Sequence, residues 1–122
     1  MKEIQVLKLL HDMKIAMDSI HIFCVGKTKT DYLEQLLLRS AVERQLEIVG
    51  EALSQIKKID TAILIRIRES QKIIAFRNIL VHAYATIDSN ISWDIVENKI
   101  PILQKEVENL IEFLTSRNGQ NY

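Results

Sequence analysis

The sequence predicts an all-α protein, an antiparallel bundle of four to five helices that forms a single domain over residues 1–122. The chain has only three glycines and one proline, which leaves few positions for the frequent turns of a β protein. Its apolar residues recur at spacings of three and four, the period of a helix with one buried face. A length of 122 residues is enough for one packed core.

Two long helices are predicted in the first half of the chain. The first ends near Gly26 and carries one apolar stripe, formed by Val6, Leu10, Met13, Met17, Ile20 and Cys24. After the loop GKTKT, Asp31 is predicted to cap the second helix, with Glu34 three residues on as in a capping box. The apolar face of the second helix is predicted to comprise Leu38, Val42, Gln45, Val49, Leu53 and Ile56.

The second half begins with an ambiguous segment, DTAILIRIRES. Its isoleucines at 63, 65 and 67 alternate as in a strand but also fit a helix, and helix is favoured because a lone strand would have no partner. From about Ser70 the pattern predicts helix through at least Val81. In the last segment Ser92 is the predicted N-cap, and Pro101 should kink or divide the helix. Its apolar stripe comprises Trp93, Val96, Ile100, Leu103, Val107, Leu110 and Leu114.

The composition limits the classes of partner and cofactor that we expect for this protein. The formal net charge is zero, so a polyanion would have to be met by a local patch, and residues 57–77 supply one with six basic residues against two acidic ones. A single cysteine and the lack of an apolar run long enough to span a bilayer favour a cytoplasmic protein without membrane contact. No cluster has metal-ligand spacing, and the Gly26-Lys27-Thr28 stretch lacks the earlier glycine and strand of a P-loop, so we expect neither metal nor cofactor.

The stretch RNILVHAY, residues 77–84, places polar side chains in an otherwise apolar helix. Asn78 and His82 are four residues apart and share one stripe, while Arg77 and Tyr84 are seven apart and share an adjacent one. Ile79, Leu80 and Val81 are predicted to fill the core side. Taken alone, a histidine and an arginine at this position also fit a helix end, where they bind the last carbonyls and the helix dipole.

The spacing Arg77-x4-His82-x-Tyr84 resembles the signature of HEPN-domain proteins, and specifically of the HepT-like toxins. AVERQLEIVGEA, residues 41–52, is similar to that family's second-helix pattern, and ISWDIVENKIPIL, residues 91–103, to its tryptophan-to-proline segment. Two positions depart from the family pattern. Gln71-Lys72-Ile73 stands where a tryptophan is common, and Ala83 where a glycine is common.

The resemblance implies a homodimeric, metal-independent endoribonuclease, the toxin of a type VII-like toxin–antitoxin system. RNA cleavage needs proton transfer and stabilisation of phosphoryl charge, because the 2′-hydroxyl can attack its own phosphorus. By the resemblance, Arg77 would hold the phosphate, His82 would move protons, and Asn78 would orient the histidine or bind substrate. Tyr84 would receive AMP from a cognate minimal nucleotidyltransferase, an MntA-like antitoxin that silences the nuclease.

Two other hypotheses remain open from the residues. One is a noncatalytic HEPN subunit that binds a nucleotide or a nucleotidyltransferase partner. The other is a plain helical interaction module in which the octet only ends a helix.

Overall fold

The computed structural model describes residues 2–82 and 88–120, and this part of the chain is built from helices alone. The first half contains α1 (Lys2–Cys24), the short α2 (Lys29–Glu34) and α3 (Leu36–Ile59). The second half contains a 3₁₀-helix, η1 (Thr61–Arg66), then α4 (Ser70–His82), α5 (Ser89–Asp94), a π-helical turn η2 (Ile95–Lys99) and α6 (Ile100–Gln120). The predicted all-α fold is confirmed.

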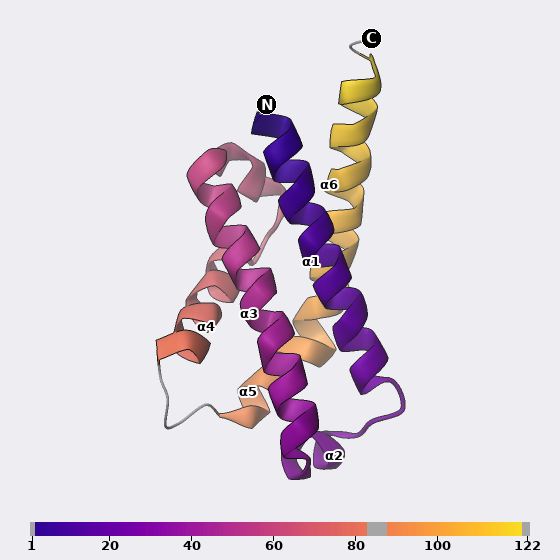
Figure 1. Cartoon of the computed structure of the whole chain (residues 1–122), viewed down its shortest axis with the longest axis vertical. Coiled ribbons are helices and arrows are strands. Elements are labelled where there is room, and N and C mark those ends of the chain that lie inside the picture. The colour runs from indigo at the N-terminus through magenta and orange to yellow at the C-terminus, as the bar shows by residue number, and fades with distance from the viewer. Residues whose placement is uncertain (1, 83–87, 121–122) are drawn as a thin grey trace.

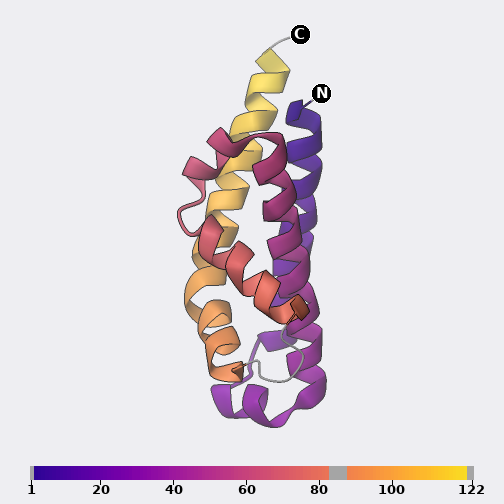
Figure 2. The same ribbon diagram turned by 90° about the vertical axis from the view of Figure 1, so that its left-hand side faces the viewer.

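Three long helices form the body of the bundle, with α1 packed between α3 and α6 (Figure 1). Helix α4 lies against α3 and crosses it obliquely, and Figure 2 shows it from its outer side. The predicted apolar stripe of α1 is buried from Val6 to Ile20. On α3 the buried member of the third turn is Leu46, whereas the predicted Gln45 is half-buried. Because α4 packs mainly against α3, it lies at the periphery of the bundle.

The ends of the first helices differ from the prediction in one detail. Gly26 has a φ of 75°, the left-handed conformation that ends α1 where the glycine predicted it. Asp31 does not cap a long helix. Thr28 is the N-cap of α2, its hydroxyl accepts from the Asp31 backbone N–H, and the Asp31 carboxylate accepts from the Thr28 N–H. The capping box therefore exists, three residues earlier than predicted.

The ambiguous segment is helical but tighter than an α-helix. Bonds of three-residue span, from Ile63 N–H to the Asp60 carbonyl and from Ile67 N–H to the Leu64 carbonyl, define η1 and its end. Ile67 is buried and Ile65 is 83% exposed. The alternation that resembled a strand thus reflects a short 3₁₀ turn with one side toward the core.

Pro101 divides the last helix, as predicted. The Ile100 N–H bonds to the Ile95 carbonyl, five residues back, which marks the π turn immediately before the proline. A proline ring clashes with the carbonyl four residues earlier, and the wider turn relieves that clash. The predicted N-cap at Ser92 is wrong: Asp88 caps α5, and its carboxylate accepts from the Asn90 N–H. Ser92 is fully buried instead.

Candidate active site

Helix α4 carries three of the four predicted site residues. It buries Ile73, Phe76 and Leu80 against the core and exposes Asn78 and His82. The prediction that Ile79 fills the core is wrong, because this side chain is 51% exposed. Tyr84, the predicted modification site, lies outside the described residues.

Arg77 packs against a glycine on α3. A Cβ atom built on Gly50 would lie 2.2 Å from Arg77 Cβ and 3.3 Å from the Ile73 carbonyl oxygen. Real Cβ contacts do not become so short, so only glycine allows α4 to approach α3 here. The distance between the two helices, and with it the depth at which Arg77 sits, is therefore set at Gly50.

The guanidinium of Arg77 is held by two polar neighbours. Its Nη2 lies 2.7 Å from Glu51 Oε2 on α3, and its Nη1 donates to Asn78 Oδ1 at 3.2 Å. The side chain is 25% exposed, and its Nε is buried without a hydrogen-bond partner among the described residues. A fixed, permanently charged fork that remains partly open to solvent is the arrangement that binds a phosphate.

Asn78 lies between Arg77 and His82 on the helix surface. Successive helical residues are about 100° apart, so Arg77 and His82 lie about 140° apart around α4. In the single chain the Asn78 side chain bonds to Arg77, and no hydrogen bond joins it to His82 within the described residues. The imidazole of His82 is exposed to solvent on the same helix.

A groove of about 560 Å³ runs over α3 between α1 and α4. Arg77, Leu80 and Val81 form its α4 wall, while Leu9 and Asp12 form its α1 wall. Its floor on α3 comprises Arg44, Glu47, Ile48, Glu51, Ala52 and Gln55. The volume is in the range of sites that hold nucleotide-sized ligands, and Arg77 stands at its edge.

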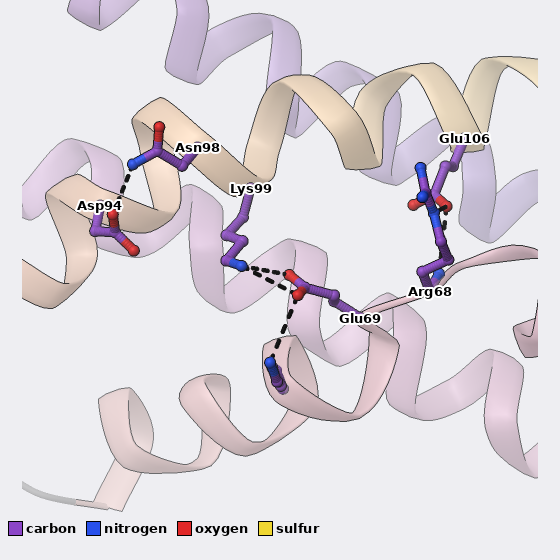
Figure 3. A network of polar contacts seen from close by, with 7 residues as sticks. Arg68, Glu69, Asp94, Asn98, Lys99 and Glu106 are labelled. Atoms are coloured by element: carbon purple, nitrogen blue, oxygen red, sulfur yellow. Dashed lines mark hydrogen bonds and ion pairs between the residues drawn. The ribbon is translucent and has the colours of Figure 1, made fainter.

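The start of α4 is fixed to η2 and α6 by ionic contacts (Figure 3). Lys99 Nζ lies 2.9 Å from Glu69 Oε2, and Lys72 lies 3.5 Å from Glu69 Oε1. About two turns further along the chain, on α6, Glu106 accepts from Arg68 Nε at 3.1 Å and from the Arg68 backbone N–H. The Lys99 ammonium lowers the pKa of the Glu69 carboxyl, with Lys72 adding to the effect. These contacts hold the residues that precede α4 against a helix that α4 itself barely touches.

Two residues of this site were missed as site residues by sequence reasoning. Glu51 lies one helical turn after Glu47, in a spacing typical of ion pairs along a helix, but it binds Arg77 on α4, while Arg44 pairs with Glu47. Gly50 carried a usable signal, because a glycine inside a helix costs about 1 kcal/mol and usually marks a close approach. Which residue Gly50 contacts depends on how α4 crosses α3, and the spacing of residues in the sequence does not determine that crossing.

The helical bundle, with an arginine and a histidine five residues apart near the end of one helix, defines an all-α HEPN-like domain. The family model for HepT-like ribonucleases matches residues 13–110, and the chain belongs to this family. The resemblance found in the sequence is thereby confirmed.

Curated relatives are named for the same class. "Putative RNase MJ1380" of Methanocaldococcus jannaschii is 31% identical over 114 residues, which cover 88% of this chain and 98% of that protein. "Putative RNase MJ0125" of the same organism is 29% identical over 114 residues, covering 88% of this chain and 92% of the relative. A third, "Gamma-glutamylcyclotransferase and putative RNase MJ0434", is 26% identical over 113 residues, and the chain spans only 48% of its length. No solved structure matches the chain.

Proposed function

We propose that this protein is a metal-independent endoribonuclease, the toxin of a type VII-like toxin–antitoxin pair. The proposal is supported by the contacts around Arg77 in this chain, which belongs to the HepT-like ribonuclease family. The aliphatic part of the Arg77 side chain lies against Gly50, and its guanidinium is held by Glu51 on one side and by Asn78 on the other. The exposed imidazole of His82 stands on the same helix.

In the proposed reaction the 2′-hydroxyl of the RNA attacks the adjacent phosphorus. His82 accepts the hydroxyl proton or donates one to the leaving oxygen. Arg77 stabilises the negative charge that gathers on the phosphoryl oxygens. Asn78, bonded to Arg77, keeps the fork in place or donates its amide N–H to the substrate. The chemistry needs no ion, because the nucleophile is part of the substrate.

One histidine cannot act as base and acid on opposite sides of one bond. We therefore propose a homodimer in which two copies of Arg77, Asn78 and His82 line one RNA cleft. The supporting observation is that Asn78 and His82 are exposed and Ile79 beside them is 51% exposed, so this face of α4 carries apolar surface open to a second copy.

The proposed regulation acts on the same residues. A cognate nucleotidyltransferase antitoxin would attach AMP to Tyr84, two residues after His82 in the sequence. The added phosphate charge would compete with RNA for Arg77. RNA and this antitoxin are the proposed partners, and the cytoplasm is the proposed location. No helix of the described residues is long and apolar enough to cross a bilayer.

A noncatalytic HEPN subunit that binds nucleotide or a nucleotidyltransferase is the second candidate. The pairing of Arg77 with Glu51 favours it, because a guanidinium held by a carboxylate is less available to a phosphate. The two candidates differ in whether the phosphate displaces Glu51.

Cleavage assays in excess chelator separate the candidates. Wild-type protein should cut RNA and leave the matching DNA intact, since DNA lacks the 2′-hydroxyl. The His82→Ala variant should bind RNA without cutting it. Equal cleavage by wild type and variant, or cleavage of DNA, contradicts the proposed mechanism. RNA binding without cleavage by the wild type favours the noncatalytic subunit.

A further inference from the structure

Half of the six basic residues between positions 57 and 77 are neutralised by ion pairs in the fold. Arg68 pairs with Glu106, Lys72 with Glu69 and Arg77 with Glu51. The other three cations form no ion pair within residues 2–82 and 88–120; they are Lys57, Lys58 and Arg66. Arg66 lies over the Phe113 ring on α6, 4.0 Å from its centroid. The two lysines of this group lie in the last turn of α3.

Lys57 differs from Lys58 in the neighbour that it binds. Its Nζ donates to Gln71 Oε1 on α4 at 3.2 Å, and both side chains are exposed. Because the lysine binds the carbonyl oxygen of the amide, the Gln71 NH₂ group remains a donor. Two donors, one of them charged, are therefore presented together at the start of α4.

Gln71 stands on the same face of α4 as the proposed catalytic histidine. Gln71, Ala75, Asn78 and His82 follow one another at spacings of four, three and four, which places them on one stripe. All four are exposed, and Ala75 at the middle is too small to obstruct the stripe. Eleven residues of helix span about 16 Å, so the Lys57–Gln71 pair stands a few nucleotides from His82.

We propose that Lys57 and Gln71 form a subsite that binds a backbone phosphate of the RNA strand, outside the bond that is cut. This subsite rests on the proposed function. A strand whose scissile bond lies beside His82 would run along the stripe toward the start of α4. Lys57 supplies the charge, Gln71 supplies a neutral donor, and neither touches the reacting atoms. The subsite therefore acts on affinity for longer RNA and not on the chemical step.

The test compares Lys57→Ala with Lys58→Ala. Both variants remove one exposed lysine from the end of α3, so their effects on net charge and on the helix dipole match. In a His82→Ala background, Lys57→Ala should weaken binding of an RNA of about ten nucleotides about fivefold. It should also reduce the slope of log K against log salt by about 0.7, the value for one single-strand phosphate contact. Lys58→Ala should change the RNA affinity and the salt slope much less than Lys57→Ala does.

A second variant tests the role of the amide. Gln71→Glu keeps the size of the side chain but pairs Lys57 with a carboxylate and repels phosphate. It should weaken binding of the longer RNA at least as much as Lys57→Ala, while Gln71→Ala should weaken it less. Both substitutions are at an exposed position, so the fold should tolerate them.

Substrate length separates this subsite from the catalytic centre. In the active protein, cleavage of a dinucleotide that spans only the scissile bond should be equally fast with Lys57 and with Lys57→Ala. Equal weakening by Lys57→Ala and Lys58→Ala, or slower dinucleotide cleavage in Lys57→Ala, overturns the subsite while leaving the nuclease intact. Absence of RNA binding and cleavage by the wild type overturns the proposed function, and the subsite with it.

Discussion

Gly50 and Arg77 form a close contact between α3 and α4, and a Cβ on the glycine would lie 2.2 Å from the arginine Cβ. The helix that carries the candidate active site is thus seated on a glycine, and the residue after that glycine, Glu51, binds the arginine. Gly50 thus determines how deeply Arg77 sits against α3, and Glu51, the next residue, determines the orientation of its guanidinium.

Replacing Gly50 by alanine should disturb both stability and the site. Alanine would gain about 1 kcal/mol of helix propensity, but the clash with Arg77 and with the Ile73 carbonyl must push α4 away, an overpacking cost of about 1 to 3 kcal/mol. We expect a net loss of unfolding free energy in urea titrations and a large loss of RNA cleavage. Gly26→Ala is the control: nothing lies within 4 Å of its Cβ, so it strains the turn and spares cleavage. A Gly50→Ala protein with normal cleavage would show that the close approach does not position Arg77.

Glu51 and an RNA phosphate should compete for Arg77. Replacing Glu51 by glutamine removes the opposing charge but keeps a hydrogen-bond acceptor, so RNA binding should tighten. The pair is partly exposed, at 25% and 43%, and solvent screening limits the change to about twofold to fivefold. Fluorescence anisotropy in a His82→Ala background measures it. Glu47→Gln, whose partner is Arg44, is the control and should change binding less. Weaker binding by Glu51→Gln would mean that the carboxylate holds Arg77 in place for the phosphate.

The ion pairs of Glu69 should make the free energy of unfolding depend on pH in the acid range. The pKa of Glu69 is lower in the folded protein than in the unfolded chain, chiefly because Lys99 binds the carboxylate. Such a group stabilises the fold above its unfolded pKa, near 4.3, and loses that contribution as the pH falls through its lower folded pKa. Glu69→Gln should therefore be less stable than wild type at pH 7, with the difference shrinking toward pH 3.

Urea titrations at several pH values test this dependence. Glu97→Gln is a suitable control, since Glu97 is exposed and forms no ion pair in the described part of the chain. A stability difference between wild type and Glu69→Gln that stays constant from pH 7 to pH 3 would show that the network adds no pH-dependent stability.

Tyr32 offers a test of the core. Its ring is fully buried, 5.2 Å from the Trp93 ring centroid, and its hydroxyl has no hydrogen-bond partner within the described residues. The nearby Ser92 hydroxyl donates to the Ser89 carbonyl instead, and burial raises the pKa of the phenol. An unpaired buried hydroxyl costs about 1 to 3 kcal/mol, so Tyr32→Phe should keep or raise the melting temperature. Tyr32→Leu should lower it, because the contact with Trp93 is lost. A strongly destabilised Tyr32→Phe would reveal a partner for the hydroxyl.

Local patterns predicted the helices well where one face is buried. The stripe from Val6 to Ile20, the end of α1 at Gly26 and the division of the last helix at Pro101 all follow from spacing, turn conformation and a missing N–H. Gln45 and Ile79 are less buried than predicted, and the other errors lie at helix starts. Thr28 and Asp88 cap where Asp31 and Ser92 were expected, because several neighbouring side chains can cap and the packing of the helix decides between them.

The sequence by itself determined the all-α class, the family, and the presence of arginine, asparagine and histidine on one helix, because helical periodicity and motif spacing are local properties. Only the tertiary structure decided what surrounds them. Glu51 binds Arg77 from 26 positions away, and Glu106 binds Arg68 from 38 positions away. These pairs depend on the crossing of α3, α4 and α6, which is set by side-chain packing across the whole core. The same crossing pairs Arg68 and Arg77 with carboxylates and leaves Lys57 beside Gln71, on the stripe that leads to His82.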